Sequence, residues 1–105
     1  MAGRVVFTVR SPLGYQVTLT RDRWREIIRY KHPALAGSGR AVRGCVEAPM
    51  IVRESIKNAS VHLYYTRAGQ VYLCVAVAPS DEQERFVVTT YFTRNIKKGR
   101  ELWTN

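Results

Sequence analysis

One histidine of this chain stands where acid-base chemistry is possible. His32 follows a strongly basic stretch, residues 21–31, and precedes Pro33. An imidazole changes its charge near neutral pH, so it can take up or release a proton during a reaction. A histidine at this position can equally cap a helix, because its ring interacts favourably with the exposed carbonyls of the last turn. The sequence leaves both interpretations open.

Cations that can bind phosphate lie farther along the chain. Arg53 and Arg67 carry guanidinium groups, which hold a phosphate through two parallel hydrogen bonds. Lys97 and Lys98 form a short basic cluster that can follow a nucleic-acid backbone. Each of these side chains is also compatible with an ordinary solvated surface charge. We assign a catalytic role to Arg53 and RNA binding to the other three.

Tyrosine and threonine side chains supply the remaining candidate groups. Tyr64 and Tyr91 can stack on a base or donate a proton, and RNA-binding proteins often place such aromatics on a sheet. Thr89 and Thr93 can donate a hydrogen bond to a phosphate. The alternatives are cross-strand packing for the tyrosines and simple strand propensity for the threonines. We assign Thr89 and Tyr91 to catalysis and Tyr64 and Thr93 to RNA binding.

Together these groups suit the cleavage of RNA without a metal. That reaction needs a base for the 2′-hydroxyl, an acid for the leaving oxygen and cations for the phosphate. The chain holds 17 Lys and Arg against 8 Asp and Glu, a net charge of +9. Such a surplus on a small protein attracts polyanions, although the same charge can simply keep a domain soluble.

Other classes of site have no pattern in this sequence. The histidines are His32 and His62 and the cysteines are Cys45 and Cys74, without the CxxC or HExxH spacing of metal sites. The Walker loop, the dinucleotide fingerprint and the Ser-His-Asp order are also missing. We therefore expect no metal and no cofactor, and we expect both thiols to be free and buried.

The spacing of apolar residues predicts the elements that position these groups. A β-hairpin is expected over residues 5–19. A helix is expected over residues 21–31, capped by Thr20 and stopped by Pro33. A second, shorter helix fits residues 42–46. The rest of the chain predicts strands at residues 50–55, 61–66, 71–77 and 86–93.

This order of elements predicts a single α+β domain over residues 1–105. The N-terminal hairpin and two helices would pack on one face of an antiparallel sheet of about four strands. Alternation places the apolar row that starts at Val71 beneath the helices. The other face would be open and lightly filled, and its expected residues are Arg53, Ser55, His62, Tyr64, Thr66, Tyr72, Cys74, Ala76, Thr89, Tyr91 and Thr93.

Several short segments form a pattern that recurs in one family. They are residues 24–28, 32–35, Val42, Val46, Pro49, residues 63–65, Val75, Val77, residues 87–91, Thr93, residues 96–97 and residues 102–103. With this pattern the chain resembles the small phage-associated nuclease-like domains of the barnase, EndoU, colicin and RelE group, often called the BECR fold. The resemblance covers residues 14–103.

The resemblance implies a helical part packed on an antiparallel sheet whose exposed face binds RNA, and metal-independent cleavage that leaves a cyclic phosphate. Barnase-like enzymes pair a glutamate with a histidine, whereas this chain offers only Glu54, out of phase with Arg53. A RelE-like or colicin-like arrangement of basic residues is the nearer analogue. The matching site positions are His32, Thr89, Tyr91 and Thr93, with Arg53 and Arg67 as further basic members.

We therefore expect a metal-independent endoribonuclease, a toxin or phage-related effector, that cleaves RNA on the open sheet face by general acid/base attack of the 2′-hydroxyl. The alternatives are a non-catalytic RNA- or DNA-binding module and a protein-interaction domain on the same fold. RNA is the expected partner, and an acidic antitoxin or inhibitor protein is the alternative partner. The sequence has no long apolar segment, which predicts a cytoplasmic location and no membrane partner.

Overall fold

A computed structural model describes residues 4–81 and 84–105. In these residues seven strands form one sheet in the order β1-β2-β6-β5-β4-β3-β7. Neighbouring strands run antiparallel except β2 and β6, which run parallel. The strands are β1 (Val5–Arg10), β2 (Gln16–Thr20), β3 (Ile51–Glu54), β4 (His62–Ala68), β5 (Val71–Pro79), β6 (Arg85–Thr93) and β7 (Glu101–Thr104).

The α+β class is therefore confirmed, but the prediction of an antiparallel sheet of about four strands was wrong. The N-terminal hairpin is part of the sheet, because β2 pairs with the first residues of β6 in parallel, Val17 with Arg85 and Thr18 with Phe86. The chain also returns to the sheet after β6, and β7 pairs with β3 at the opposite edge. A four-residue strand such as β7 is too short to show an alternating pattern of its own.

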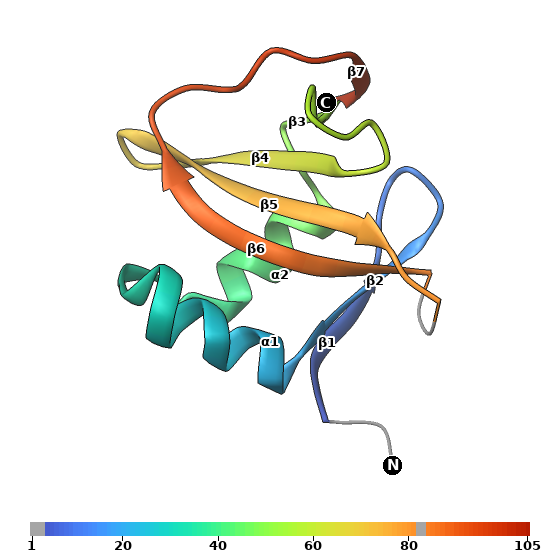
Figure 1. The fold of residues 1–105 in the computed structure, drawn as a ribbon. Coiled ribbons are helices and arrows are strands. Elements are labelled where there is room, and N and C mark those ends of the chain that lie inside the picture. The colour runs from blue at the N-terminus through green and yellow to red at the C-terminus, as the bar shows by residue number, and fades with distance from the viewer. Residues whose placement is uncertain (1–3, 82–83) are drawn as a thin grey trace.

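Helices cover one face of this sheet (Figure 1). Thr20 caps the first of them, because its Oγ1 accepts a hydrogen bond of 3.2 Å from the backbone N–H of Arg23. The helix predicted over residues 21–31 is confirmed, although its second half is a wider π turn that ends at His32, before Pro33. The helical elements are α1 (Arg21–Glu26), η1 (Ile27–Lys31), η2 (Pro33–Leu35) and α2 (Gly39–Glu47).

The main core lies between these helices and the sheet. The apolar row of β5 packs there as predicted, and the helical elements η1, η2 and α2 contribute buried side chains to it. Each fully buried Leu, Ile or Val side chain stabilises the fold by about 1.5–3 kcal/mol relative to an exposed one. Members that are almost completely buried include Val17, Leu19, Ile27, Leu35, Val42, Val46, Leu73, Val75, Val77 and Val87. In the described part of the chain, no helix has the length and apolar character needed to cross a membrane.

The opposite face of the sheet is covered as well, so the prediction of an open, lightly filled face was wrong. The connection from β6 to β7, residues 94–100, crosses this face on the side away from the helices (Figure 1). Its Ile96 packs on a second, smaller core that consists of Ile51, Leu63, Tyr65, Cys74 and Ala76. We call residues 94–100 the crossing segment and this side of the sheet the second face.

A β-bulge in β6 decides which of its side chains reach the second face. Ala76 pairs with Thr89, and the next residue, Val77, pairs with Val87, so Val88 is the extra residue of the bulge. Val87 is therefore fully buried in the main core, whereas Val88 packs on the smaller core. Thr89 and the residues that alternate with it lie on the second face, as predicted.

For β4 the predicted faces were reversed. Tyr65 pairs with Ile51 and with Cys74, which places it on the second face. His62, Tyr64 and Thr66 therefore lie on the helix side, and Tyr64 is fully buried in the main core. Residues 63–65 are all buried, although their side chains alternate between the two faces of the sheet. Alternation of apolar and polar residues therefore could not indicate which side faces the helices.

Candidate active site

Tyr91, on the second face, has two chemically competent neighbours. The ring of His32 lies 5.7 Å from the ring of Tyr91, measured between centroids, with an angle of 36° between the planes. The Nζ of Lys97 lies 5.8 Å from the centroid of the same ring. An imidazole and an ammonium group therefore both lie near the ring of Tyr91. We call these three residues the His32 cluster.

The fold brings the cluster together from three separate parts of the chain. Tyr91 comes from β6, and Lys97 from the crossing segment that covers the second face. His32 ends the first helical segment: its backbone N–H donates to the Ile27 carbonyl, and its own carbonyl accepts from Leu35. His32 thus ends the helical segment through its backbone, and its ring contacts Tyr91; capping of the last turn by the ring stays a prediction.

The ring of Tyr91, rather than its hydroxyl, faces the cluster. Burial, and after it a hydrogen bond with the side chain of Cys74, raises the pKa of Tyr91 well above its ordinary value. The phenol therefore stays protonated, and its oxygen is engaged with the neighbouring strand β5. What remains available on the second face is the aromatic surface, which positions His32 and the ammonium of Lys97.

The backbone of Lys97 is fixed from two sides. Its N–H donates to the Oη of Tyr65 over 3.1 Å, and its carbonyl accepts from the Nη1 of Arg53 over 3.0 Å. Burial raises the pKa of Tyr65 to about 12, so that hydroxyl stays neutral as well. A third bond of 2.8 Å runs from the backbone N–H of Glu54 to the carbonyl of Arg100. The crossing segment is therefore anchored to β3 and β4, and the ammonium of Lys97 has a defined origin.

Arg53 and Thr89 lie on the second face but not in the cluster itself. Paired positions run from Arg53 through Leu63 and Ala76 to Thr89, across four neighbouring strands. Three strand spacings separate the two residues by about 14 Å, so they cannot hold the same phosphate oxygen. Thr89 is two residues from Tyr91 on the same side of β6, whereas Arg53 reaches the cluster through the backbone of Lys97.

Arg53 and Thr89 each have one buried polar side-chain atom. The Nε of Arg53 and the Oγ1 of Thr89 are buried, and neither has a hydrogen-bond partner within the described residues. Buried donors and acceptors in folded proteins are almost always paired, with protein, water or ligand. The second face therefore holds two polar atoms that a bound molecule or a water can satisfy.

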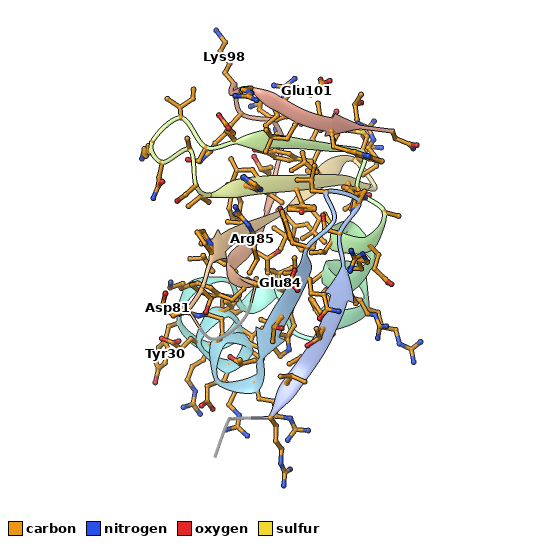
Figure 2. The ribbon with its side chains drawn as sticks, turned by 90° about the vertical axis from the view of Figure 1, so that its right-hand side faces the viewer. Tyr30, Asp81, Glu84, Arg85, Lys98 and Glu101 are labelled. Atoms are coloured by element: carbon orange, nitrogen blue, oxygen red, sulfur yellow. The ribbon has the colours of Figure 1, made fainter. Side chains whose placement is uncertain are left out.

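The residues predicted to bind RNA separate into different environments. The guanidinium of Arg67 lies over the ring of Tyr72, 5.2 Å from its centroid. The Oγ1 of Thr93 exchanges hydrogen bonds with the backbone of Asn95, so it shapes the start of the crossing segment. Lys98 extends away from the ribbon beside β7 (Figure 2). Tyr64 does not reach the second face at all, and a fully buried ring cannot stack on a base.

Comparison with family models, with curated proteins and with solved structures found no match to this chain. The function of the His32 cluster must therefore be inferred from its own chemistry.

One polar network was missed by the sequence analysis. Tyr64 donates a hydrogen bond of 2.6 Å to the hydroxyl of Tyr15, which lies 2.7 Å from the Nδ1 of His62, and the hydroxyl of Ser11 lies 2.5 Å from that of Tyr64. The four side chains tie the turn between β1 and β2 to β4. Polar side-chain atoms need hydrogen-bond partners when they are buried in the core. His62 and Tyr64 were expected on the open face, so no partners were predicted for them.

This network makes stability depend on pH in a defined direction. Burial, and after it the charge of Arg85, lowers the pKa of His62 to about 4, although Glu54 opposes the shift. An unfolded histidine titrates near ~6.5, so the unfolded chain binds more protons at intermediate pH. The free energy of unfolding should therefore be fully supported by His62 above about pH 6.5 and should decrease as pH falls toward 4.

Denaturant titrations between pH 4 and pH 7 measure this effect. We expect the unfolding midpoint of His62→Gln to fall less on acidification than that of the unchanged protein. Both proteins carry the same carboxylates, so the difference between the two curves isolates His62. Parallel curves over the whole range would contradict the assignment of a lowered pKa to this histidine.

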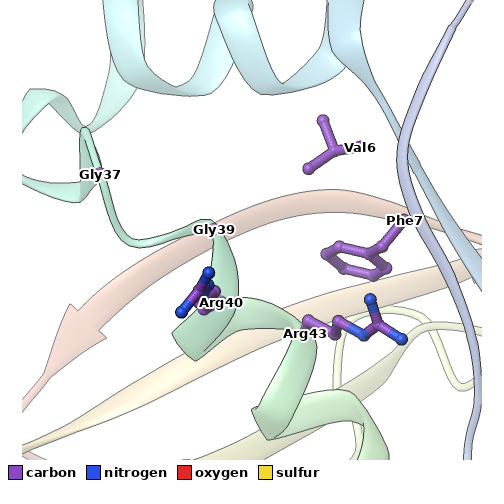
Figure 3. A pocket seen from close by; sticks show the side chains of 6 residues that line it. All are labelled: Val6, Phe7, Gly37, Gly39, Arg40 and Arg43. Atoms are coloured by element: carbon purple, nitrogen blue, oxygen red, sulfur yellow. The ribbon is translucent and has the colours of Figure 1, made fainter.

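A separate hollow on the helix side has a different character. It measures about 340 Å³, and its lining residues are Val6, Phe7, Gly37, Gly39, Arg40 and Arg43 (Figure 3). Two arginines provide positive charge there, but none of the lining side chains exchanges a proton near neutral pH. We therefore place the candidate chemistry on the second face.

Proposed function

We propose that this protein is a metal-independent endoribonuclease whose active centre is the His32 cluster. The observation that carries the proposal is that His32 and the ammonium of Lys97 each lie within 6 Å of the centre of the Tyr91 ring. A proton-transfer group and a cation are thereby gathered around one aromatic side chain, and cleavage of a phosphodiester by its own 2′-hydroxyl requires groups of these two kinds. The net charge of +9 supports a polyanionic substrate.

The roles follow from the chemistry of each side chain. The neutral imidazole of His32 removes the proton of the 2′-hydroxyl, and the 2′-oxygen forms a bond to phosphorus. The ammonium of Lys97 stabilises the negative charge that develops on the phosphate and supplies the proton that the departing 5′-oxygen needs. The products are a 2′,3′-cyclic phosphate and a 5′-hydroxyl. Exchange with water then restores both side chains.

Tyr91 and Arg53 act as positioning residues in this proposal. The Tyr91 ring holds the two reacting groups at about the same distance from its centre. Arg53 fixes the backbone from which Lys97 extends. The hydroxyl of Thr89 is buried two residues from Tyr91 on the same side of β6, so in this proposal Thr89 supports the strand that carries Tyr91.

In this proposal side chains carry out every proton transfer and stabilise the charge on the phosphate. We therefore expect cleavage to proceed in the presence of EDTA.

The test is incubation of the purified protein with total RNA in EDTA, followed by analysis of the fragments and their ends. Discrete fragments with cyclic phosphates would support the proposal. A matched pair of oligonucleotides, identical except for a 2′-deoxy sugar at the cleaved position, provides the control, because the deoxy strand lacks the nucleophile. Intact RNA that binds less tightly as salt rises would instead support a non-catalytic binding module.

A further inference from the structure

A pocket of about 370 Å³ opens on the second face beside the His32 cluster. Its inner wall is Leu63 of β4, which is 6% exposed. The other walls come from the connection between β3 and β4 and from the crossing segment. Its volume falls in the range of about 300–1,000 Å³ that is typical of small-ligand sites. The lining residues are Ser55, Ile56, Lys57, Leu63, Lys97 and Lys98.

The lining combines an apolar surface with positive charge. Ile56 is 75% exposed, so a branched apolar side chain is presented to solvent. Three of the lining residues are lysines and none is acidic. The nearest carboxylate in the sequence, Glu54, acts on His62 on the opposite side of the sheet. An occupant with a flat apolar part and a negative charge would match this lining.

Hydrogen bonds hold both loop segments that form walls of the pocket. The crossing segment is held by the three hydrogen bonds that tie Lys97 and Arg100 to β3 and β4. The opposite wall is closed by two backbone bonds of 2.9 Å, from Ser55 to the Val61 carbonyl and from Val61 to the Asn58 carbonyl. A pocket with anchored walls loses little conformational freedom when it binds a ligand.

We infer that this pocket binds the nucleotide next to the cleaved bond of an RNA strand. The base would contact Ile56 and Leu63, and the phosphate would lie between the ammonium groups of Lys57 and Lys98. Lys97 lines the pocket and also contacts Tyr91, so one strand can occupy both sites in succession. The inference rests on the proposed function, because it takes RNA as the substrate.

The binding test uses small probes that cannot be cleaved. We would titrate the ¹⁵N-labelled protein with a nucleoside 5′-monophosphate, the corresponding nucleoside, inorganic phosphate and triglutamate. We expect the monophosphate to shift the amide signals of Ile56, Lys57 and Lys98 and to bind more tightly than the nucleoside or phosphate alone. Equal shifts with triglutamate would overturn the inference in favour of an acidic peptide site, as would shifts confined to other parts of the protein.

Two surface variants separate the two halves of the site. Ile56→Ser should weaken monophosphate binding by about fivefold to tenfold, while Val5→Ser, an exposed apolar residue at the far edge strand β1, should leave it unchanged. Lys98→Gln should weaken the binding of an RNA oligonucleotide and reduce its salt slope by about 0.7, whereas Arg10→Gln should not. Unchanged affinity in both pocket variants would refute the assignment.

The outcome for this pocket can be distinguished from the outcome for the enzyme. If the protein cleaves RNA but its pocket does not bind the monophosphate, the nuclease proposal stands and the nucleotide subsite is refuted. Monophosphate binding at the pocket of a protein that does not cleave RNA would keep the nucleotide site and remove the catalytic role of the His32 cluster.

Discussion

The substitution His32→Ala should lower the rate of RNA cleavage by about 10²- to 10⁴-fold, the range that a positioned acid-base group contributes. His32 is partly exposed, and its backbone makes the helix-ending hydrogen bonds, which alanine retains. The fold should therefore survive the change. Initial cleavage rates of an oligonucleotide in EDTA, together with the thermal unfolding midpoint, measure the two effects separately.

A second pair of variants shows whether Tyr91 acts through its ring or its hydroxyl. Tyr91→Phe keeps the aromatic ring that His32 and Lys97 contact and removes only the phenol oxygen, which forms a hydrogen bond with the side chain of Cys74. It should therefore retain most of the cleavage activity, whereas Tyr91→Leu should lose it. A His32→Ala protein as active as the unchanged one would exclude the proposed mechanism, whatever the tyrosine variants do.

Some of the cluster could be predicted from the sequence because its signals are local. Pro33 indicated that the basic helix ends at His32. The two-residue spacing of Thr89 and Tyr91 in a strand placed both side chains on the same face of the sheet. The contacts of His32 and Lys97 with Tyr91 are different, because they join three segments that lie far apart in the sequence. No local pattern reports how such segments are placed relative to one another, so the residues could be proposed but their contacts could not.

The faces of the sheet show where pattern-based prediction fails. In β5 one row is larger and more apolar than the other, and the prediction for that strand was right. In β4 the consecutive residues Leu63, Tyr64 and Tyr65 are all buried, because each face of the sheet carries its own core. Apolar and polar residues alternate along a strand only when one face of the sheet is exposed to solvent. The crossing segment covers the second face over the middle of the sheet, so the pattern of β4 does not show which side faces the helices.

Gly99→Ala should have the largest structural effect of any single change near the site. Gly99 adopts a φ of +156°, and a Cβ at this position would lie 2.1 Å from the backbone oxygen of Glu54. Neither group is the end of a flexible side chain, so the crossing segment would have to move away from β3. We expect a loss of about 2 kcal/mol or more in the free energy of unfolding, from backbone strain and from the bond between Glu54 and Arg100.

The same displacement should abolish RNA cleavage, because Lys97 lies two residues before Gly99 and depends on the crossing segment for its position. Gly69→Ala is the matched control: Gly69 also has a positive φ, of +63°, but a Cβ there would touch nothing within 4 Å. That variant should lose about 1–2 kcal/mol from left-handed strain alone and keep its activity. Chemical denaturation and the cleavage assay applied to both variants separate strain in general from displacement of the crossing segment. If the two glycine variants lose stability and activity to the same extent, the position of Lys97 does not depend on the contact between Gly99 and β3.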